Sequence, residues 1–293
     1  MRGDDIALHC PSIYTKGTIR FSSIKSRILA RLPIYLFTPY YFPRSRKTIT
    51  LISPMSQLSN YRLLCFDVYG TLIDWETGIL TALEPLLHTG TTEFSRKHLL
   101  TLYQELESEQ QRVTPDMPYS ELLATIHPRL AERLGLLTPS EDDNQRFGDS
   151  VGRWPAFPDT VDALERLSKH FKLVVLSNVD RASFARSNAG SLQGFPFDRI
   201  ITAQDVGSYK PDPRNFAYMK EVAQKELSVS AKEILQTAQS QFHDHRPAKE
   251  AGIRSVWIER PGATMGNTVE EPIFDWRFNT LGEMADALER EEE

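Results

Sequence analysis

The residue best placed to do chemistry in this sequence is Asp67, in the stretch 66–72. The apolar run 63–66 before it predicts a buried parallel strand, so Asp67 follows the carboxyl end of a strand, where open α/β sheets bind ligands. A carboxylate is costly to bury without a cation or hydrogen-bond donors. Gly70 permits a sharp turn, and Thr71 brings a hydroxyl close. The pattern indicates an aspartate held forward as a nucleophile, with a strand-ending turn and an Asx-type hydrogen bond as the alternative.

Three further polar clusters follow later strands in the chain. They are Ser177-Asn178, Lys210 and Asp244. Because the carboxyl ends of parallel strands share one edge of a sheet, these groups can converge on Asp67. Each also has a simpler interpretation, as a helix cap or as a solvated loop residue. The hypothesis of one common site rests on the occurrence of all four clusters in this order.

The elements that must position these groups alternate after residue 158. Short apolar runs predict strands at 171–176, 200–201, 234–238 and 255–258, and periodic segments predict helices after Asp159, at 183–192, 215–227 and 247–251, and from Thr280 to Leu288. Asp159 is expected to cap its helix, and Thr280 and Glu283 to form a capping box. The alternation predicts an α/β fold, a Rossmann-like parallel sheet covered by helices on both faces.

Residues 77–152 show helical periodicity and no convincing strand. Helices are expected at 75–87, 93–112 and 118–135, where apolar residues recur at three- and four-residue steps. A helical insert directly after the first strand predicts a separate cap. The predicted domains are therefore an α/β core, 61–76 with 153–293, and a helical cap, 77–152.

Charge is distributed unevenly along the 293 residues. The first 54 carry nine basic and two acidic side chains, so the overall charge of −5 leaves −12 on the remainder. An acidic body argues against a nucleic-acid surface. The composition, 40% hydrophobic and 25% charged, is ordinary for a soluble globular protein.

The segment 1–54 is expected to be a basic, disordered leader. A mitochondrial presequence, or upstream sequence translated before a true start at Met55, are the alternatives. The apolar-leaning stretch 28–42 is too short and too interrupted by charge and proline to span a membrane. Cys10 and Cys65 lie in dissimilar sequence, so no disulfide is expected. We expect a cytoplasmic location, with mitochondrial targeting as the alternative.

The four clusters resemble the motifs of the haloacid dehalogenase superfamily over most of residues 61–260. The first motif corresponds to 67–72, the second to 176–178, the third to 210–213 and the fourth to 243–244. The helical insert resembles the cap that follows the first motif in that superfamily. Tyr69 stands where phosphatase members carry the aspartate that protonates the leaving alkoxide. A halide leaves without a proton, and this tyrosine is similar to the 2-haloacid dehalogenase (type II) branch.

The resemblance implies hydrolysis of the carbon-halide bond of a small 2-haloacid through an aspartyl ester. Asp67 would be the nucleophile, oriented by Thr71. Lys210 would pair with Asp67 and with the substrate, and Ser177 would hold a substrate oxygen. Asp244 would activate or orient the hydrolytic water.

The resemblance also implies a substrate-binding set. Asn178 would hold a substrate oxygen, and Tyr69 would contact the substrate. Gln241 replaces the asparagine usual in the fourth motif. Apart from the resemblance, His243 or His245, which flank Asp244, is expected to tune that aspartate or to meet the substrate, because an imidazole can share a proton with a carboxylate near neutral pH. The alternative is that both are loop histidines with solvent-side hydrogen bonds. Arg112 is the loose match to the arginine that dehalogenase caps place over the halide.

That scheme implies no metal and no cofactor. One alternative is a magnesium-dependent phosphatase, in which Asp67, the Tyr69 carbonyl and Asp244 would hold the cation. Another is a binding or regulatory homologue with weakened catalysis, favoured by Gln241 and by Phe216, which replaces a tyrosine. We expect a small-molecule substrate, no nucleic acid and no membrane, and a homodimer stays open.

Overall fold

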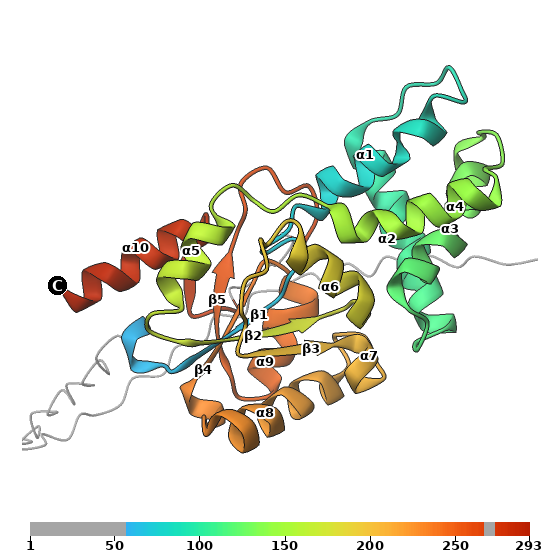
Figure 1. Cartoon of the computed structure of the whole chain (residues 1–293). Helices are drawn as coiled ribbons and strands as arrows, with labels where there is room; N and C mark the ends of the chain where they lie inside the picture. The colour runs from blue at the N-terminus through green and yellow to red at the C-terminus, as the bar shows by residue number, and fades with distance from the viewer. Residues whose placement is uncertain (1–56, 267–272) are drawn as a thin grey trace, which may run out of the picture. The chain divides into compact units, whose positions relative to one another are not determined.

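A six-stranded parallel sheet forms the centre of the computed structural model, which describes residues 57–266 and 273–293 (Figure 1). Its order is β3-β2-β1-β4-β5-β6. The strands are β1 (Leu63–Phe66), β2 (Lys172–Ser177), β3 (Arg199–Thr202), β4 (Ile234–Ala238), β5 (Arg254–Ile258) and β6 (Trp276–Phe278). Because β1 pairs with β2 on one side and β4 on the other, Asp67 follows a central strand. The predicted leader, 1–54, lies outside the described residues.

Both faces of the sheet are covered, as the sequence pattern predicts. Alternate residues of β1 enter two different cores, because side chains of a strand point to opposite faces. Leu63 and Cys65 share one core with α8 (Pro213–Leu227). Leu64 and Phe66 share the other with α5 and α10. The core helices are α5 (Thr160–Leu167), α6 (Arg181–Ala189), α7 (Ala203–Val206), α8, α9 (Arg246–Glu250) and α10 (Leu281–Glu292). These findings confirm the predicted α/β fold.

Helices alone connect β1 to β2 over the described residues 77–152. They are α1 (Trp75–Leu87), α2 (Arg96–Val113), α3 (Tyr119–Leu134) and α4 (Glu141–Asp149), followed by a 3-10 turn at Ser150–Arg153. We call the segment 75–153 the helical insert. It projects beyond one end of the sheet, at the upper right of Figure 1. The periodic leucines of α2 and α3 are buried, as their spacing predicts. The exact domain boundaries at residues 77 and 152 remain a prediction.

The prediction that Asp159 caps its own helix is wrong. Its side chain makes no cap hydrogen bond to α5. Instead, one carboxylate oxygen accepts from Arg260 Nη1 at 2.5 Å and the other from the backbone N–H of Gly282 at 3.0 Å. Asp159 therefore ties α5 to the start of α10, a contact that only the folded chain creates.

Two further differences concern the C-terminal part. The strand β6 is three residues long and lies at the sheet edge, which left too little pattern to predict it. The capping box at Thr280 is half formed. Thr280 accepts from the N–H of Glu283 at 3.1 Å, but the Glu283 carboxylate accepts from the N–H of Asn279 at 2.8 Å rather than from Thr280.

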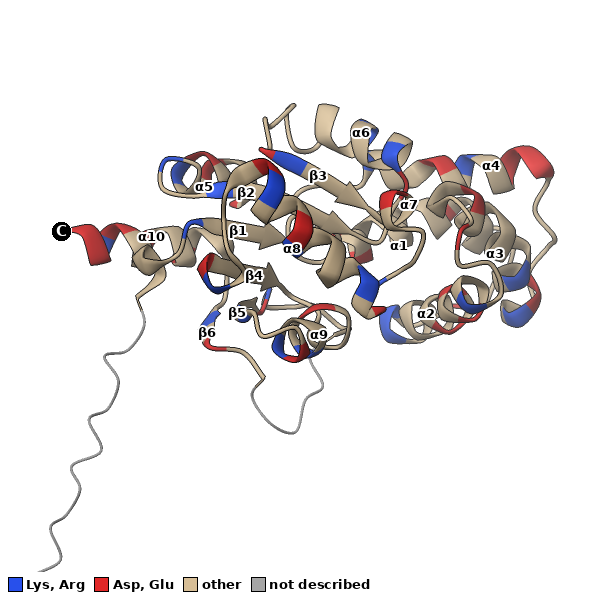
Figure 2. Ribbon diagram, turned by 90° about the horizontal axis from the view of Figure 1, so that it is seen from below, with Lys and Arg blue, Asp and Glu red and all other residues tan. Residues whose placement is uncertain are grey.

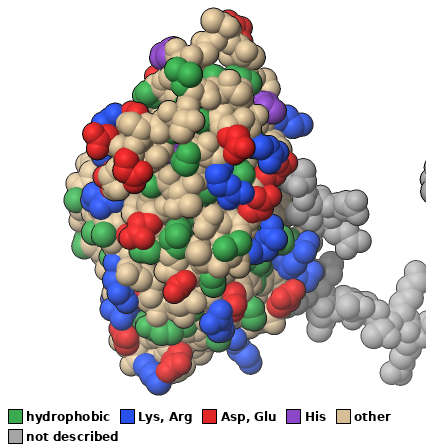
Figure 3. All heavy atoms as spheres, turned by 90° about the vertical axis from the view of Figure 1, so that its right-hand side faces the viewer, with side chains coloured by type: hydrophobic (Ala, Val, Ile, Leu, Met, Phe, Trp, Pro, Cys, Tyr) green, Lys and Arg blue, Asp and Glu red, His purple; other side chains and the backbone are tan. Residues whose placement is uncertain are grey.

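Charged positions lie mainly on the helices and at the strand starts, while the strands themselves are largely uncharged (Figure 2). On the face of the molecule at the end of the helical insert, acidic and basic side chains are interspersed (Figure 3). Within the described part of the chain, no helix combines the length and apolar character needed to cross a membrane.

Arg260 stabilises the loop that follows β1, and its removal should be costly. Its guanidinium, 3% exposed, donates to the Thr71 carbonyl from Nε at 2.9 Å and Nη2 at 2.7 Å, and also pairs with Asp159. Arg260→Met is expected to lower the free energy of unfolding by about 3 kcal/mol in urea denaturation, because it leaves a carboxylate without its buried partner. Arg277→Met, which breaks an exposed pair with Glu259, should cost less than about 1 kcal/mol. Equal losses would contradict the assignment.

Candidate active site

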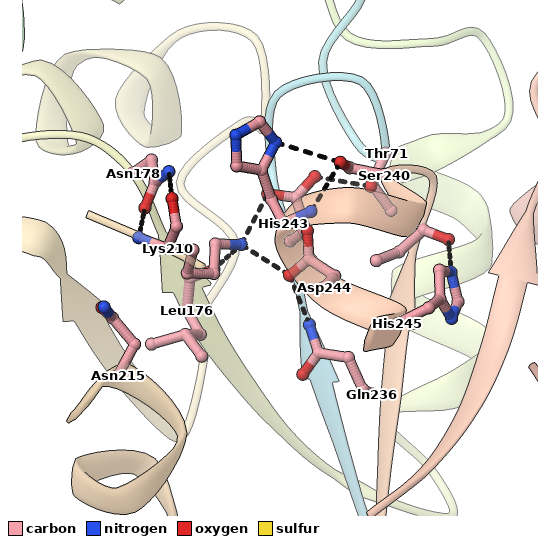
Figure 4. Close-up of polar contacts among 12 residues, drawn as sticks. Thr71, Leu176, Asn178, Lys210, Asn215, Gln236, Ser240, His243, Asp244 and His245 are labelled. Carbon is pink, nitrogen blue, oxygen red and sulfur yellow. Dashed lines mark hydrogen bonds and ion pairs between the residues drawn. The ribbon is translucent and has the colours of Figure 1, made fainter. Parts of the chain in front are cut away.

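A buried ammonium group joins the predicted catalytic residues. Lys210 Nζ donates to Asp67 Oδ1 at 3.0 Å, to Asp244 Oδ1 at 2.7 Å and to the Leu176 carbonyl at 2.8 Å (Figure 4). The three charged side chains are at most 10% exposed. They come from the segments after β1, β3 and β4, which end at one edge of the sheet. The structure therefore brings together three clusters that the sequence separates by up to 177 positions.

The cluster holds two carboxyl groups and one ammonium, and the ammonium attracts both carboxylates, which repel each other. Burial by itself would lower the pKa of Lys210, but the charges of Asp244 and Asp67 outweigh it and raise that pKa above its ordinary value. Burial also raises the pKa of Asp244, an effect that Lys210 opposes. Lys210 therefore stays protonated and supplies the cation that buried carboxylates require.

Both oxygens of Asp67 are held in place. Thr71 Oγ1 donates to Oδ2 at 2.7 Å, while Lys210 holds Oδ1. Thr71 Oγ1 also accepts from the N–H of Gln239 at 2.9 Å, so β4 fixes the hydroxyl that orients the carboxylate. Gly70 makes this approach feasible, since its φ of 101° is one that side-chain-bearing residues rarely adopt.

The second-motif residues differ in what they bond. Asn178 Oδ1 accepts from the Lys210 N–H at 2.6 Å, and Asn178 Nδ2 donates to the Lys210 carbonyl at 2.9 Å. Asn178 therefore fixes the backbone of Lys210, as Figure 4 shows, although it also lines the cavity described below. Ser177 is 2% exposed, and its hydroxyl has no hydrogen-bond partner in the described part of the chain. Ser177 is not among the residues that line that cavity, so its contact with a substrate oxygen stays a prediction.

Asp244 is fully buried, and only one of its two carboxylate oxygens has hydrogen-bond partners among the described residues. Gln236 Nε2 donates to its Oδ1 at 2.9 Å, whereas Oδ2 has no hydrogen-bond partner among the described residues. His245, the next residue, has a structural role. Its Nε2 donates to the Ala238 carbonyl at 2.9 Å and its Nδ1 bonds the Ser255 hydroxyl at 2.8 Å. Burial lowers the pKa of His245 to about 4, so this buried imidazole is neutral.

A cavity of about 330 Å³ lies between the core and the helical insert. The core side includes Tyr69, Asn178, Gln239, Ser240 and His243, and the insert side includes Gln104, Glu107, Ser108, Gln111 and Tyr119. The Tyr69 hydroxyl bonds Ser187 at 3.0 Å, and its ring stands edge-on to that of Trp154. This volume suits a small organic molecule.

The remaining predicted binding residues have different outcomes. His243 lines the cavity and bonds Ser240 Oγ through Nδ1 at 3.1 Å, and burial lowers its pKa to about 4. Gln241 is buried and does not line the cavity, and its Oε1 has no partner in the described part. Arg112 is exposed and lies outside the cavity lining. The structure therefore does not support Arg112 as a substrate-binding residue.

The cavity-lining side of α2 is mostly polar. Besides Tyr103, its lining residues follow the spacing of one helix face, namely Gln104, Glu107, Ser108 and Gln111. Arg112, the residue after Gln111, is exposed and is not among them. This polar face has the same period as the apolar residues of α2, so the apolar spacing alone did not reveal it.

The groups that a magnesium ion would need are already engaged. Lys210 Nζ lies between Asp67 and Asp244, so a metal ion held by both carboxylates would compete with this ammonium. Within residues 57–266 and 273–293, no group of three or more His, Cys, Asp or Glu side chains is arranged to hold a metal ion.

A family model of haloacid dehalogenase-like hydrolases matches residues 61–235, more than half of the chain. The chain belongs to this family. This hydrolase is 25% identical over 236 residues to the (S)-2-haloacid dehalogenase H-109 of Pseudomonas putida, covering 77% of this chain and 96% of that protein. It is 26% identical over 216 residues to the (S)-2-haloacid dehalogenase 4A of Burkholderia cepacia, covering 70% and 86%. The L-2-haloacid dehalogenase structure from Xanthobacter autotrophicus has a TM-score of 0.65, at 18% identity, covering 78% and 98%.

Replacing the buried ammonium should destabilise the protein in a pH-dependent way. Lys210→Met leaves two buried carboxyl groups without a cation, so the pKa of Asp244 rises further and its ionisation costs more. The loss of unfolding free energy should therefore grow from pH 5 to pH 8, reaching about 3–5 kcal/mol. Urea denaturation at both pH values measures it. Lys172→Met removes an exposed pair with Asp198 and should show no such growth. A loss for Lys210→Met that is independent of pH would contradict the charge arrangement.

Proposed function

We propose that this hydrolase removes halide from C2 of a small 2-haloacid through an ester on Asp67. The observation that carries the proposal is the Asp67 carboxylate, held by Thr71 and Lys210 two residues before Tyr69, which lines the cavity. A tyrosine cannot replace the general acid that an alkoxide leaving group needs, and a halide needs none. The curated relatives named above, both called (S)-2-haloacid dehalogenases, support the same reaction class.

In the first step, a carboxylate oxygen of Asp67 attacks C2 of the substrate. The carbon-halogen bond breaks with its electron pair, the halide leaves, and an ester joins Asp67 to C2. The Thr71 hydrogen bond limits rotation of the carboxylate, so attack starts from a fixed geometry. We assign the Ser177 hydroxyl, which has no hydrogen-bond partner in the described part of the chain, as a donor to the substrate carboxylate.

In the second step, water attacks the carbonyl carbon of the Asp67 ester. Asp244 takes a proton from that water, since its Oδ2 is free of protein hydrogen bonds. The bond between the carbonyl carbon and the former Asp67 oxygen that is now joined to C2 breaks, and Asp244 returns the proton to that oxygen. A 2-hydroxyacid is released. The water oxygen stays in the Asp67 carboxylate. Lys210, which contacts both aspartates, stabilises the negative charge as it moves between them.

The two alternatives concern the substrate and the efficiency of the site. A magnesium-dependent phosphatase would need Lys210 to share Asp67 and Asp244 with the metal ion. A weakened homologue would follow if the Gln241 and Phe216 replacements mattered. Phe216 is 1% exposed within the apolar core that includes α8, and its side chain does not line the cavity.

Halide and phosphate release, measured side by side with and without a chelator, test the proposal. We expect halide release from 2-chloro- and 2-bromopropionate that the chelator does not reduce. Asp67→Asn should lower it on the order of 10⁴-fold or more, since the nucleophile is lost. Asp142→Asn, an exposed site on α4, is the matched control and should keep wild-type activity. Magnesium-dependent phosphate release without halide release would support the phosphatase, and neither activity would support the weakened homologue.

The ester mechanism predicts where water oxygen goes. After many turnovers in ¹⁸O-labelled water, mass spectrometry of the peptide that contains Asp67 should show incorporated label. After a single turnover in that water, the product hydroxyl should be unlabelled because it comes from Asp67. A labelled product with an unlabelled Asp67 would instead indicate direct attack of water on C2.

A further inference from the structure

The insert side of the cavity carries an acidic group, Glu107, and the cavity lining contains no arginine among the described residues. Glu107 lies on the cavity face of α2. Tyr119 donates its hydroxyl to Glu107 Oε1 at 2.5 Å, and the Tyr103 and Tyr119 hydroxyls bond each other at 2.6 Å. We call Glu107, Tyr103 and Tyr119 the Glu107 cluster. It is a short hydrogen-bonded chain that ends in a carboxyl group at the cavity wall.

Two other glutamates on α2 show what an ordinary surface carboxylate does on this helix. Glu105 pairs with Arg133 at 3.5 Å and Glu109 with Arg129 at 2.6 Å, both arginines coming from α3. In the described part of the chain, Glu107 makes no salt bridge, and no lysine or arginine lines the cavity. Glu107 is therefore a half-buried carboxyl group that faces the cavity without a cation.

The carboxyl group of Glu107 has unused acceptor capacity. A carboxylate can accept about four hydrogen bonds. The two that the protein supplies, from Tyr119 at 2.5 Å and from Gln111 Nε2 at 3.4 Å, both go to Oε1. A donor on a bound molecule can therefore reach this carboxylate without displacing its protein partners.

Because the Glu107 carboxyl group is largely removed from water, a hydrogen-bond donor on a bound molecule would stabilise its ionised form. Burial raises the pKa of Glu107 to about 7, although the neighbouring hydroxyls of Tyr119 and Tyr103 lower it. Tyr209 also faces the group from the segment before α8. Burial, and then the charge of Glu107, raise the pKa of Tyr209 above its ordinary value. All the titratable neighbours of Glu107 that affect its pKa are thus neutral tyrosines, and none supplies a positive charge.

We propose that the Glu107 cluster is a specificity subsite for the C2 substituent of the substrate, and that it takes a hydrogen-bond-donating group. A substituent that ends in an ammonium group should bind more tightly than one that ends in a hydroxyl, because the ammonium also supplies the missing positive charge. A substituent that ends in a hydroxyl should in turn bind more tightly than one that ends in a methyl group. The inference rests on the proposed function for the identity of C2. The core groups around Asp67 carry out the reaction, and Glu107 selects which 2-haloacid is bound.

Three unreactive product analogues of equal size test the subsite by isothermal titration calorimetry on the full-length protein. They are 2-hydroxybutyrate, 2,3-dihydroxypropionate and 3-amino-2-hydroxypropionate, which differ only in ending as CH₃, OH or NH₃⁺. At pH 8 we expect the amino compound to bind roughly tenfold more tightly than 2-hydroxybutyrate, with the dihydroxy compound between them. Lowering the pH to 5.5 should reduce this preference, because Glu107 becomes protonated.

The matched variants separate the subsite from general effects of charge. Glu107→Gln should reduce the preference for the amino compound to about twofold or less, a value consistent with one neutral hydrogen bond. Glu109→Gln makes the same change two residues away, at a carboxylate that faces α3, and should keep the wild-type preference. Circular dichroism of each variant confirms that it is folded.

The proposal is overturned if 2-hydroxybutyrate binds wild type as tightly as the amino compound, if none of the three binds, or if Glu107→Gln keeps the preference. It is also overturned if Glu109→Gln loses the preference equally. Halide release from 2-bromobutyrate, assayed in parallel, tests the proposed function separately. A binding preference without halide release supports the subsite and contradicts the dehalogenase, and halide release without a preference does the reverse.

Discussion

The buried ammonium of Lys210, held between Asp67 and Asp244, is the interaction on which the rest of the site depends. Burial raises the pKa of Asp244 and by itself would lower that of Lys210, and the charge of each opposes the effect of burial on the other. The three segments that carry these residues must therefore end at the same edge of the sheet. The parallel order, with β1 between β2 and β4, provides this edge. Asn178 forms hydrogen bonds to both backbone groups of Lys210 and so fixes the position of its backbone relative to β2.

The α/β core and the helical insert make different contacts at the site. The core fixes the reacting groups, with Arg260 holding the Thr71 carbonyl and Thr71 holding Asp67. The helical insert covers the cavity and contributes a polar face of α2 that takes no part in holding the core together. Chemistry and recognition can therefore change independently, since a substitution on that face leaves the Lys210 cluster intact.

Much of the site could be predicted from the sequence, because its elements follow local rules. The apolar run 63–66 identified the central strand, and the polar residues that follow the strands identified Asp67, Lys210 and Asp244 as neighbours. Predictions failed where a partner comes from a distant segment. Asp159 resembles a helix cap, yet it pairs with Arg260 and with α10, and no local pattern reveals either partner.

The sequence by itself determined the order of strands and helices and the residue types at the strand ends, because periodicity and turn residues act over a few positions. Only the tertiary structure decided which side chains enter the cavity and which find partners elsewhere. Three glutamates on α2 look equivalent in sequence, but α3 supplies arginines to Glu105 and Glu109 and none to Glu107. Arg112, on the same helix, lies outside the cavity lining. The direction of a side chain has meaning only against the surface it faces, and that surface is assembled from segments far apart in the chain.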